Sequence, residues 1–282
     1  MKFADLHLHT NLSDGTFTPE ELVAQAQKHE LACIALTDHD TVEGCVRAAA
    51  ACGAAGIEFI AGTELTAEHD DTEVHLLGYF LDTRNELLLA EIARFQAVRK
   101  QRIYEMVARI NELGLPLKAE AVFTLANCES PGRPHVARAL VKERMVRNLD
   151  EAFERFLKKG RPAWVPKSKM SAREGVDLIH QAGGLAVMAH PGLNRTDDII
   201  PALVAAGLDG IECFHSKHSN TLSKRYLSMA EQFGLLVTGG SDCHGFSKIR
   251  PLIGSVKIPY ELVEKLKAKV AERQRSGSSG HE

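Results

Sequence analysis

The chain has 282 residues, of which 44% are hydrophobic and 25% are charged, as in globular proteins that bury a sizeable core. Its formal net charge of −3 argues against broad binding to nucleic acid or to an anionic membrane surface. No apolar run is long enough to span a bilayer and the first residues have no signal-peptide core, so we expect neither membrane insertion nor export.

Six cysteines are scattered through the chain without a C-x-x-C pair. This pattern predicts reduced thiols in a cytoplasmic protein and argues against a structural zinc finger. The six are Cys33, Cys45, Cys52, Cys128, Cys213 and Cys243.

The first stretch with a chemical signal is residues 5–10, which reads Asp-Leu-His-Leu-His-Thr. As a β-strand it would place His7 and His9 on one face and Leu6 and Leu8 on the other. Two imidazoles at this spacing can reach one metal ion. Because a His-x-His pair is weak evidence by itself, the rest of the chain must decide.

Short apolar runs then alternate with helical patterns. The capping box Thr18-Pro19-Glu20-Glu21 predicts a helix to about residue 30, and Thr41 is expected to open an alanine-rich helix. A last helix is expected over 261–273, with a frayed tail from about residue 275. The predicted strands cover residues 31–36, 57–60, 74–80, 185–189, 210–214, 235–238 and 253–258.

The pattern between residues 82 and 183 is helical. Ser171-Ala172-Arg173-Glu174 is a second capping box within it. We therefore predict a helical insertion over 82–183, a barrel formed by 1–81 and 184–274, and a disordered tail over 275–282. One apolar stripe of the insertion consists of Ile92, Val98, Ile103, Val107 and Ile110.

Repeated strand–helix units with few hairpin signals predict parallel strands joined by helical crossovers, closed or nearly closed as an α/β barrel. The carboxyl ends of the strands share one mouth in such a barrel. Ligand-type residues such as His39, Glu64 and His190 follow three different predicted strands. We therefore expect them to meet at the mouth, with the insertion above it.

Several motifs carry a resemblance to a known family. In chain order, the segments His7-Leu8-His9, Thr37-Asp38-His39-Asp40, His190-Pro191 and Ser241-Asp242-Cys243-His244 resemble the motifs of the polymerase and histidinol phosphatase (PHP) family. A narrower resemblance, to the branch of nucleoside 3′,5′-bisphosphate phosphatases and RNase AM, comes from Gly62-Thr63-Glu64, the Glu-Val-His-Leu-Leu-Gly segment at 73–78, and Gly132-Arg133-Pro134-His135.

The resemblance implies a distorted (β/α)7 barrel with up to three divalent metal ions at its mouth. Mn²⁺ is the expected ion, with Fe²⁺ or Zn²⁺ as alternatives, because mixed imidazole and carboxylate ligands suit all three. The implied ligands are His7, His9, Glu64 and Asp242 for one ion, Glu64, His75 and His190 for a second, and Asp14, His39 and His244 for a third.

The implied chemistry is attack on a phosphate ester by a metal-bridging hydroxide, without a covalent phosphoenzyme. Arg133 is a candidate bidentate phosphate clamp. His135 and His218 are candidates for contacting the substrate or protonating the leaving group. The roles of Lys167, Lys169 and His215 stay open.

The expected substrate is a small phosphorylated nucleotide. The leading hypothesis is removal of the 3′-phosphate from nucleoside 3′,5′-bisphosphates such as pAp, with 5′-to-3′ trimming of short RNA as a related activity. The alternatives are a histidinol-phosphate phosphatase and, from another class, a non-catalytic regulatory or nucleic-acid-binding module that metal stabilises. We expect a monomer without an extended nucleic-acid surface.

Overall fold

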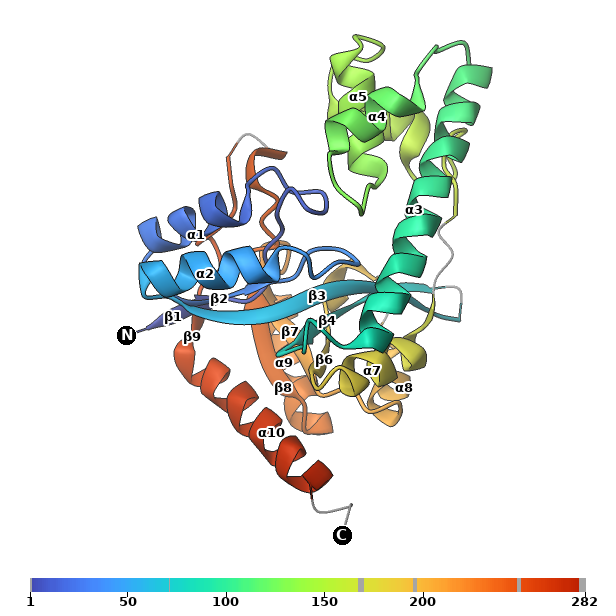
Figure 1. Cartoon of the computed structure of the whole chain (residues 1–282). Coiled ribbons are helices and arrows are strands. Elements are labelled where there is room, and N and C mark those ends of the chain that lie inside the picture. Colours follow the sequence, from blue (N-terminus) through green and yellow to red (C-terminus); the bar gives the residue numbers. More distant parts are fainter. Residues whose placement is uncertain (1, 71, 167–169, 195–196, 248–249, 279–282) are drawn as a thin grey trace.

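The computed structural model describes residues 2–70, 72–166, 170–194, 197–247 and 250–278. Its centre is one curved sheet in the order β8-β7-β6-β4-β3-β2-β1-β9, with the short β5 (Met170–Ser171) paired to β3 (Figure 1). The strands on this path are β1 (Phe3–Asp5), β2 (Leu31–Leu36), β3 (Glu58–His69), β4 (Thr72–Tyr79), β6 (Leu185–Met188), β7 (Gly210–His215), β8 (Leu236–Gly240) and β9 (Ile258–Pro259).

The sheet closes into a barrel where the chain leaving β1 meets the chain leaving β8. The Leu6 amide donates to the Gly239 carbonyl oxygen at 3.1 Å, and the Asp242 amide donates to the His7 carbonyl oxygen at 2.9 Å. The Ser241 amide also donates to the buried Asp5 carboxylate at 2.9 Å. The predicted α/β barrel is thereby confirmed, although the described part of the sheet has more than the seven strands that the resemblance implied.

The expectation of parallel strands is wrong at β4, which pairs antiparallel with both β3 and β6. The strand predicted to end before Gly62 continues to His69, because its polar second half pairs with β4 through the turn at Asp70, where φ is 44°. This reversal brings the first half of β4 to the barrel mouth, since an antiparallel strand starts where its parallel neighbours end.

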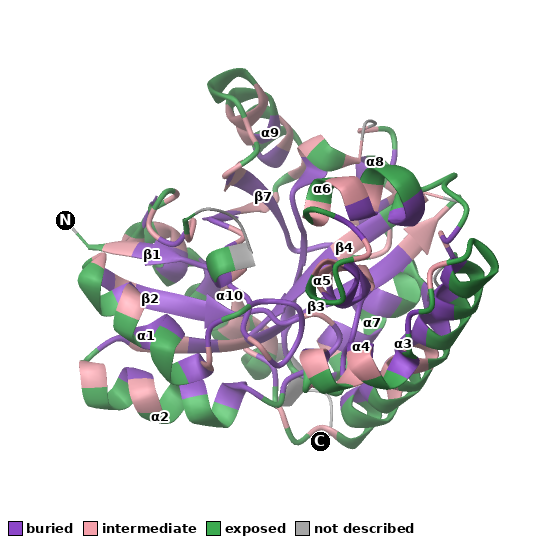
Figure 2. Ribbon diagram, turned by 90° about the horizontal axis from the view of Figure 1, so that it is seen from above, coloured by how far each residue is buried: buried purple, intermediate pink, exposed green. Residues whose placement is uncertain are grey.

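Helices cover the outside of the barrel, and Figure 2 shows buried strands inside a ring of partly exposed helices. The Thr18 capping box is confirmed, with the Glu21 amide donating to Thr18 Oγ1 at 3.2 Å. The helix expected from Thr41 begins later, at Cys45. The covering helices are α1 (Pro19–Lys28), α2 (Cys45–Ala55), α7 (Ala172–Gln181), α8 (Ile200–Ala205), α9 (Asn220–Phe233) and α10 (Tyr260–Ser278), with the short helices η2 (Pro191–Leu193) and η3 (Gly245–Ser247) at the mouth.

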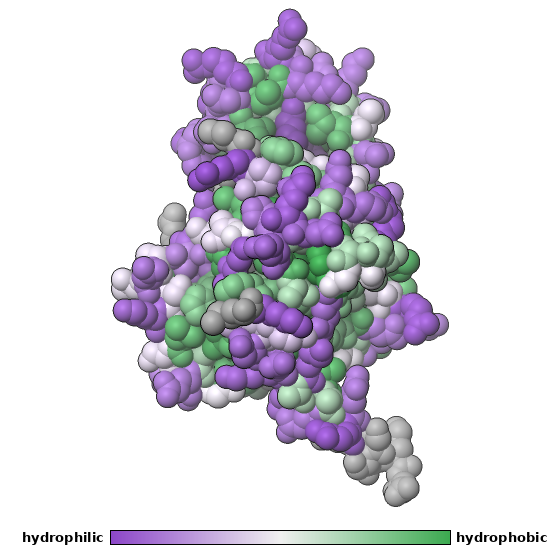
Figure 3. Space-filling model, turned by 90° about the vertical axis from the view of Figure 1, so that its left-hand side faces the viewer, coloured by the Kyte–Doolittle hydropathy of each residue, from purple (hydrophilic) through white to green (hydrophobic). Residues whose placement is uncertain are grey.

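Helix α10 continues to Ser278, and residues 279–282 lie outside the described part, so the disordered tail over 275–282 stays a prediction. Figure 3 shows hydrophilic side chains over most of one face of the molecule. None of the described helices combines the length and apolar character needed to cross a membrane.

A helical subdomain stands above the barrel and has a core of its own, which includes Ile103, Val136 and Leu157 (Figure 1). The long helix α3 joins both bodies, because Phe95 belongs to the barrel core and Ile103 to the upper one. The subdomain comprises α3 (Glu86–Glu112), α4 (Ala119–Ala126), α5 (Arg133–Lys142), α6 (Leu149–Ala152) and the π-helix η1 (Phe153–Leu157).

The predicted insertion over 82–183 extends further than this core. Helix α7 lies inside those bounds, yet its Val176 and Ile179 are buried in the barrel core. The division of the chain stays a prediction, and this packing favours a subdomain that ends before α7.

Candidate metal centre

Histidine and carboxylate side chains converge at the barrel mouth from almost every strand. His7 and His9 follow β1, and His39 follows β2, where it forms an isolated bridge with Glu64. Glu64 lies in β3 and His75 in β4. The sequence-predicted ligands that come from the later strands are His190 after β6 and Asp242 and His244 after β8.

Glu64 is the fully buried hub of the cluster. Its Oε2 atom lies 3.3 Å from His7 Nε2, 3.3 Å from His9 Nε2 and 3.2 Å from His39 Nδ1. Its Oε1 atom lies 2.7 Å from His75 Nδ1 and 2.9 Å from His190 Nε2. One carboxylate therefore faces two groups of imidazoles, as a ligand shared between two cations would.

Asp242 forms a second meeting point. Its Oδ1 atom lies 3.2 Å from His9 Nε2 and 3.5 Å from His7 Nε2, and its Oδ2 atom lies 3.3 Å from His215 Nε2. The backbone of Asp242 has φ of 53° and that of His190 has φ of 26°, a region that non-glycine residues seldom adopt. Such strain is typical of positions that the surrounding fold holds for function.

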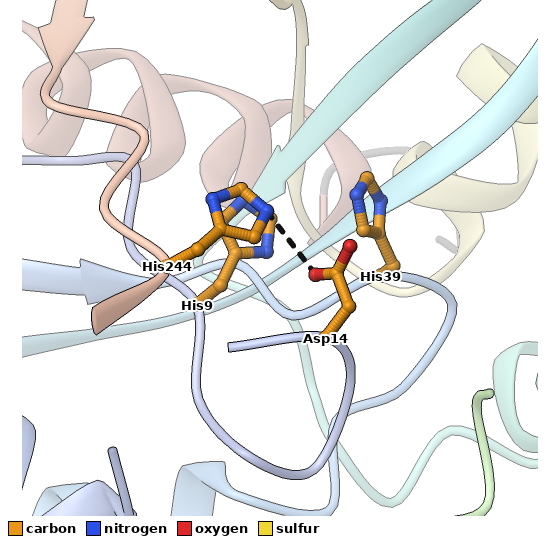
Figure 4. Close-up of side chains that lie close together, drawn as sticks. All are labelled: His9, Asp14, His39 and His244. Atoms are coloured by element: carbon orange, nitrogen blue, oxygen red, sulfur yellow. Dashed lines mark ion pairs between the residues drawn. The ribbon is translucent and has the colours of Figure 1, made fainter. Parts of the chain in front are cut away.

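Asp14 completes a third group, which the turn after the first histidines carries into the cluster (Figure 4). Asp14 Oδ1 lies 3.1 Å from His244 Nε2. The rings of His9 and His244 stack with centroids 4.1 Å apart. His9, Asp14, His39 and His244 each offer a ligand atom, and these atoms all lie within 4.8 Å of one another.

Several buried ligand-type atoms of the cluster have no hydrogen-bond partner. Buried polar groups are normally paired, because leaving one unpaired is unfavourable by about 1–3 kcal/mol. A cation bound among these atoms would satisfy them, and the imidazole and carboxylate donor set suits a divalent metal. Among the described residues, the atoms that form no hydrogen bond are both ring nitrogens of His9, Asp14 Oδ1, Nδ1 of His39 and of His190, and His215 Nε2. Four of them, His9 Nε2, Asp14 Oδ1, His39 Nδ1 and His215 Nε2, nevertheless lie 3.1–3.3 Å from an ion-pair partner.

The pKa values of the cluster show that its buried carboxylates are compensated by positive charge. Burial opposes ionisation of Glu64, yet the imidazoles of His39, His75 and His7 hold the pKa of this carboxyl well below its ordinary value. Burial also disfavours the charged form of His7, but Glu212, Glu64 and Asp242 raise its pKa well above the ordinary value. The acids are thus held ionised, and protons on imidazoles supply the compensating charge that a metal ion would replace.

Glu212 is a buried group of the site that sequence reasoning missed. Its Oε1 atom lies 3.0 Å from His7 Nδ1, and its Oε2 atom accepts a hydrogen bond from the His190 backbone amide at 2.7 Å. Carboxylates in this position fix the orientation and tautomer of a ligating histidine. The available signal was a single acid within the apolar strand Gly210–His215.

The helical subdomain forms hydrogen bonds with the loops that carry the cluster. Arg138 Nη2 donates to the Asp14 carbonyl oxygen at 2.5 Å, and Ser130 Oγ donates to the His39 carbonyl oxygen at 2.7 Å. Arg99 Nε donates to Asp40 Oδ2 at 2.7 Å. These contacts couple the position of the subdomain to the geometry of two predicted ligands.

Of the predicted substrate residues, Arg133 lines a cavity beside the cluster. His135 is 1% exposed, and its Nδ1 atom accepts from the Gly132 amide at 3.0 Å at the start of α5. His218 uses both ring nitrogens, since Nδ1 donates to the Cys213 carbonyl oxygen at 3.1 Å and Nε2 accepts from the Gly192 amide at 3.2 Å. These bonds favour structural roles for the two histidines.

His215, whose role the sequence left open, joins the cluster beside His7 and Asp242. Lys167 and Lys169 lie outside the described residues.

Comparison with known proteins adds a family and several relatives. The model of the PHP domain family matches residues 5–109. A 3′,5′-nucleoside bisphosphate phosphatase of Chromobacterium violaceum is 34% identical over 85% of this chain and 86% of that protein. A 5′-3′ exoribonuclease of Haemophilus influenzae is 33% identical over 85% of this chain and 89% of that protein.

Two further similarities extend the picture. A phosphoribosyl 1,2-cyclic phosphate 1,2-diphosphodiesterase of Eggerthella lenta is 31% identical over 86% of this chain and 94% of that protein. A crystal structure from Bifidobacterium adolescentis, provisionally described as a metal-dependent phosphoesterase, superimposes with a TM-score of 0.87 and 34% identity over 93% of this chain and 94% of that one.

Proposed function

The chain belongs to the PHP family and is a phosphoric ester hydrolase, and on that premise we propose that it removes the 3′-phosphate from nucleoside 3′,5′-bisphosphates such as pAp. The observation that carries the proposal is the convergence of imidazoles and carboxylates around Glu64, next to a cavity that contains Arg133. The similarity to the Chromobacterium violaceum phosphatase supports the substrate class.

The donor set of the cluster fits two or three divalent ions, and we propose Mn²⁺ with Fe²⁺ or Zn²⁺ as alternatives. When bound, such ions lower the pKa of water towards about 7 and neutralise phosphoryl oxygens. We propose His7, His9, Glu64 and Asp242 for one ion, Glu64, His75 and His190 for a second, and Asp14, His39 and His244 for a third. The placement of His9 also allows it to contribute to the third group.

The chain's own contribution is orientation and exclusion of water. Glu64 and Asp242 are held ionised, so both can accept cations at neutral pH. Glu212 fixes the ring of His7 from behind. Arg133 supplies a planar guanidinium that can bind a phosphate in bidentate fashion, which an ammonium group does less well.

A second activity, trimming of short RNA from its 5′ end, is favoured by the similarity to the Haemophilus influenzae exoribonuclease. The two reactions are chemically related, because each breaks the bond between a nucleoside 3′-oxygen and phosphorus. The phosphate leaves as inorganic phosphate in the first reaction and stays on the 5′-oxygen of the next nucleoside in the second. We further propose a cytoplasmic monomer, and the free thiols of all six cysteines support the reducing compartment.

The test is a substrate panel on protein purified without chelator and analysed for its metal content. Metal-loaded protein is incubated with pAp, histidinol phosphate and a short 5′-phosphorylated RNA, and released phosphate and nucleotide are measured. We expect pAp to have the highest kcat/KM. A higher kcat/KM for histidinol phosphate would make the protein a histidinol-phosphate phosphatase instead. Full metal occupancy without turnover of any substrate would indicate a non-catalytic module.

A further inference from the structure

The loop that runs from the first histidines to Asp14 is fastened to the barrel by one buried carboxylate, that of Asp38. Asp38 follows β2 and is 1% exposed. Its Oδ1 atom accepts hydrogen bonds from the Thr10 amide at 2.7 Å and from Ser13 Oγ at 2.5 Å, and its Oδ2 atom accepts from Thr10 Oγ1 at 2.5 Å. Because hydrogen bonds of this kind replace the water that a buried carboxylate loses, Asp38 and the loop hold each other in place.

Each residue in these hydrogen bonds stands directly beside a ligand-type residue of the third group in the sequence. The neighbours are Thr10 with His9, Ser13 with Asp14, and Asp38 with His39. Adjacent Cα atoms are only about 3.8 Å apart, so a shift of a bonded residue also moves its neighbour. The Asp38 carboxylate therefore controls the distances among three of the four side chains whose ligand atoms lie within 4.8 Å of one another (Figure 4).

Other ligand-type residues of the cluster are anchored by groups other than this carboxylate. Glu64 is bonded to Asp38 through the backbone, since the Glu64 amide donates to the Asp38 carbonyl oxygen at 3.1 Å. Glu212 contacts the ring of His7, and the Asp242 amide donates to the His7 carbonyl oxygen at 2.9 Å. A change confined to the Asp38 side chain leaves these anchors in place.

The loop also has hydrogen bonds that do not involve Asp38. The Gly15 amide donates to the Thr10 carbonyl oxygen at 2.9 Å and closes the turn. On the side of the helical subdomain, Arg138 Nη2 donates to the Asp14 carbonyl oxygen at 2.5 Å. Without the Asp38 carboxylate, the loop therefore keeps its own turn and its contact with the subdomain, and it loses its side-chain link to the end of β2.

We propose that Asp38 is the positioning residue of the third ion, the one assigned above to Asp14, His39 and His244. This inference rests on the proposed function and specifies how one of its ion sites is built. The oxygens of Asp38 accept bonds from the loop, so Asp38 acts through the loop and not as a ligand. It holds Asp14 at the distance from His39 at which both reach one cation. Loss of its carboxylate weakens the third ion selectively.

The first experiment counts ions in the absence of substrate. Metal-free wild-type protein and Asp38→Asn are titrated with Mn²⁺ alone, and the unbound ion is measured by its electron paramagnetic resonance signal. Asparagine keeps the size of the side chain but replaces one accepting oxygen by an amide group. The Kd of one ion should rise by about 10- to 100-fold, as for other groups that orient a ligand, and the Kd of the others should change by less than about threefold.

Two further variants identify the affected ion. Asp14→Asn should weaken the third ion directly, because Asp14 is assigned to that ion alone. Ser13→Ala removes one donor to Asp38 and keeps the Asp14 side chain. Both should weaken the same ion as Asp38→Asn. The double variant Ser13→Ala/Asp38→Asn should weaken it by less than the product of the two single effects, because both substitutions break the same hydrogen bond.

The matched control is Asp209→Asn at the other end of the barrel. Asp209 is also a buried acid, and its donors are His180, the Ala186 amide and Arg273. This substitution should lower the unfolding midpoint and leave every Mn²⁺ Kd within about threefold of wild type. Unfolding midpoints of the metal-free proteins are measured for all variants. If Asp38→Asn fails to fold, Ser13→Ala decides.

Four results would overturn the proposal. Equal weakening of all ions, or a lower unfolding midpoint with unchanged Mn²⁺ binding, would mean that Asp38 only supports the fold. Weakening of a different ion from the one that Asp14→Asn affects would assign Asp38 to another group. Wild-type protein without a third ion would leave nothing for Asp38 to position, and independent effects of Ser13→Ala and Asp38→Asn would contradict action through their shared bond.

Failure of the proposed function would be seen separately. It would appear as wild-type protein that binds Mn²⁺ with the expected differences among the variants and yet does not turn over pAp.

Discussion

The two ends of the barrel use the same kinds of side chain in opposite ways. At the base, Asp209 precedes β7 and has every carboxylate oxygen paired, with His180 Nε2 at 2.8 Å, the Ala186 amide at 2.9 Å and Arg273 Nη2 at 2.8 Å. At the mouth, several buried ring nitrogens of the imidazoles around Glu64 form no hydrogen bond with any described residue. Both ends use acids and histidines, and they differ in how many of the polar atoms form hydrogen bonds.

This difference separates stability from function in one fold. The base acid links α7, β6 and α10 through bonds that are complete in the protein alone. The mouth is complete only with ions bound, so its polar groups lower stability until they are occupied. Polar clusters at the carboxyl ends of barrel strands typically serve catalysis, whereas those at the amino ends typically serve stability, and the two ends of this barrel follow that division.

The largest expected effect comes from removing the hub of the mouth. Glu64→Gln should lower phosphatase activity by more than about 100-fold, beyond the 10- to 100-fold typical of groups that only support a ligand. Saturating Mn²⁺ should raise the unfolding free energy of wild-type protein, by about 2.7 kcal/mol at 100 times its Kd, and should do so less in the variant. Activity assays and thermal scans with and without metal provide the measurements. Unchanged metal stabilisation in the variant would remove Glu64 from the site.

The corresponding change at the base should lower stability and leave activity and metal content unchanged. Asp209→Asn breaks a buried pair with Arg273 and should lower the unfolding free energy by about 2–3 kcal/mol, or roughly 4–8 °C in Tm. Activity per folded molecule and metal content should stay within about twofold of wild type. Urea denaturation and elemental analysis test both statements. A loss of bound metal would contradict the division of roles between the two ends.

Glu212 lies between these extremes, because it is paired like a base residue but pairs with a predicted ligand. Glu212→Gln keeps the shape and can still contact His7, but it removes the charge that orients the ring. We expect metal affinity to fall by about 10- to 100-fold, with kcat at saturating metal much less affected. Metal titration followed by activity at saturation separates the two quantities. A normal affinity with a reduced kcat would instead assign Glu212 a direct part in the reaction.

The same contrast explains how far the sequence could predict the site. The positions of His39, His190 and Asp242 were predictable because parallel strands all end at the same mouth of the barrel. A polar residue directly after an apolar strand is therefore expected to lie at that mouth. His75 reaches the mouth for another reason, since β4 runs antiparallel and presents its first half there. The resemblance, and not the strand pattern, supplied that residue.

What the sequence could not predict is which polar atoms already have partners. Glu212 meets His7 across 205 residues, and nothing local marks the pairing. His218 and His135 look like candidate acids in the sequence, yet backbone amides occupy their acceptor nitrogens. In the sequence, Arg102 is one of many charged residues of α3, and only the packing of the subdomain reveals that it is buried and bonded to a backbone carbonyl oxygen.

The smallest predicted effect concerns pH and sharpens the contrast at the base. Burial alone would raise the pKa of Asp209, but hydrogen bonds from His180 and Ala186 and the charge of Arg273 hold it below its ordinary value of 3.8. The ionised form therefore contributes stability that is fully present above about pH 4 and is lost as pH falls through the folded-state pKa. The stability difference between wild type and Asp209→Asn, measured by urea denaturation in chelator, should be constant from pH 7 to 5 and shrink towards pH 3. Chelator removes the metal-dependent contribution of the mouth from both proteins, so a difference that instead grew on acidification would mean that the Asp209 pairs destabilise the fold in their ionised form.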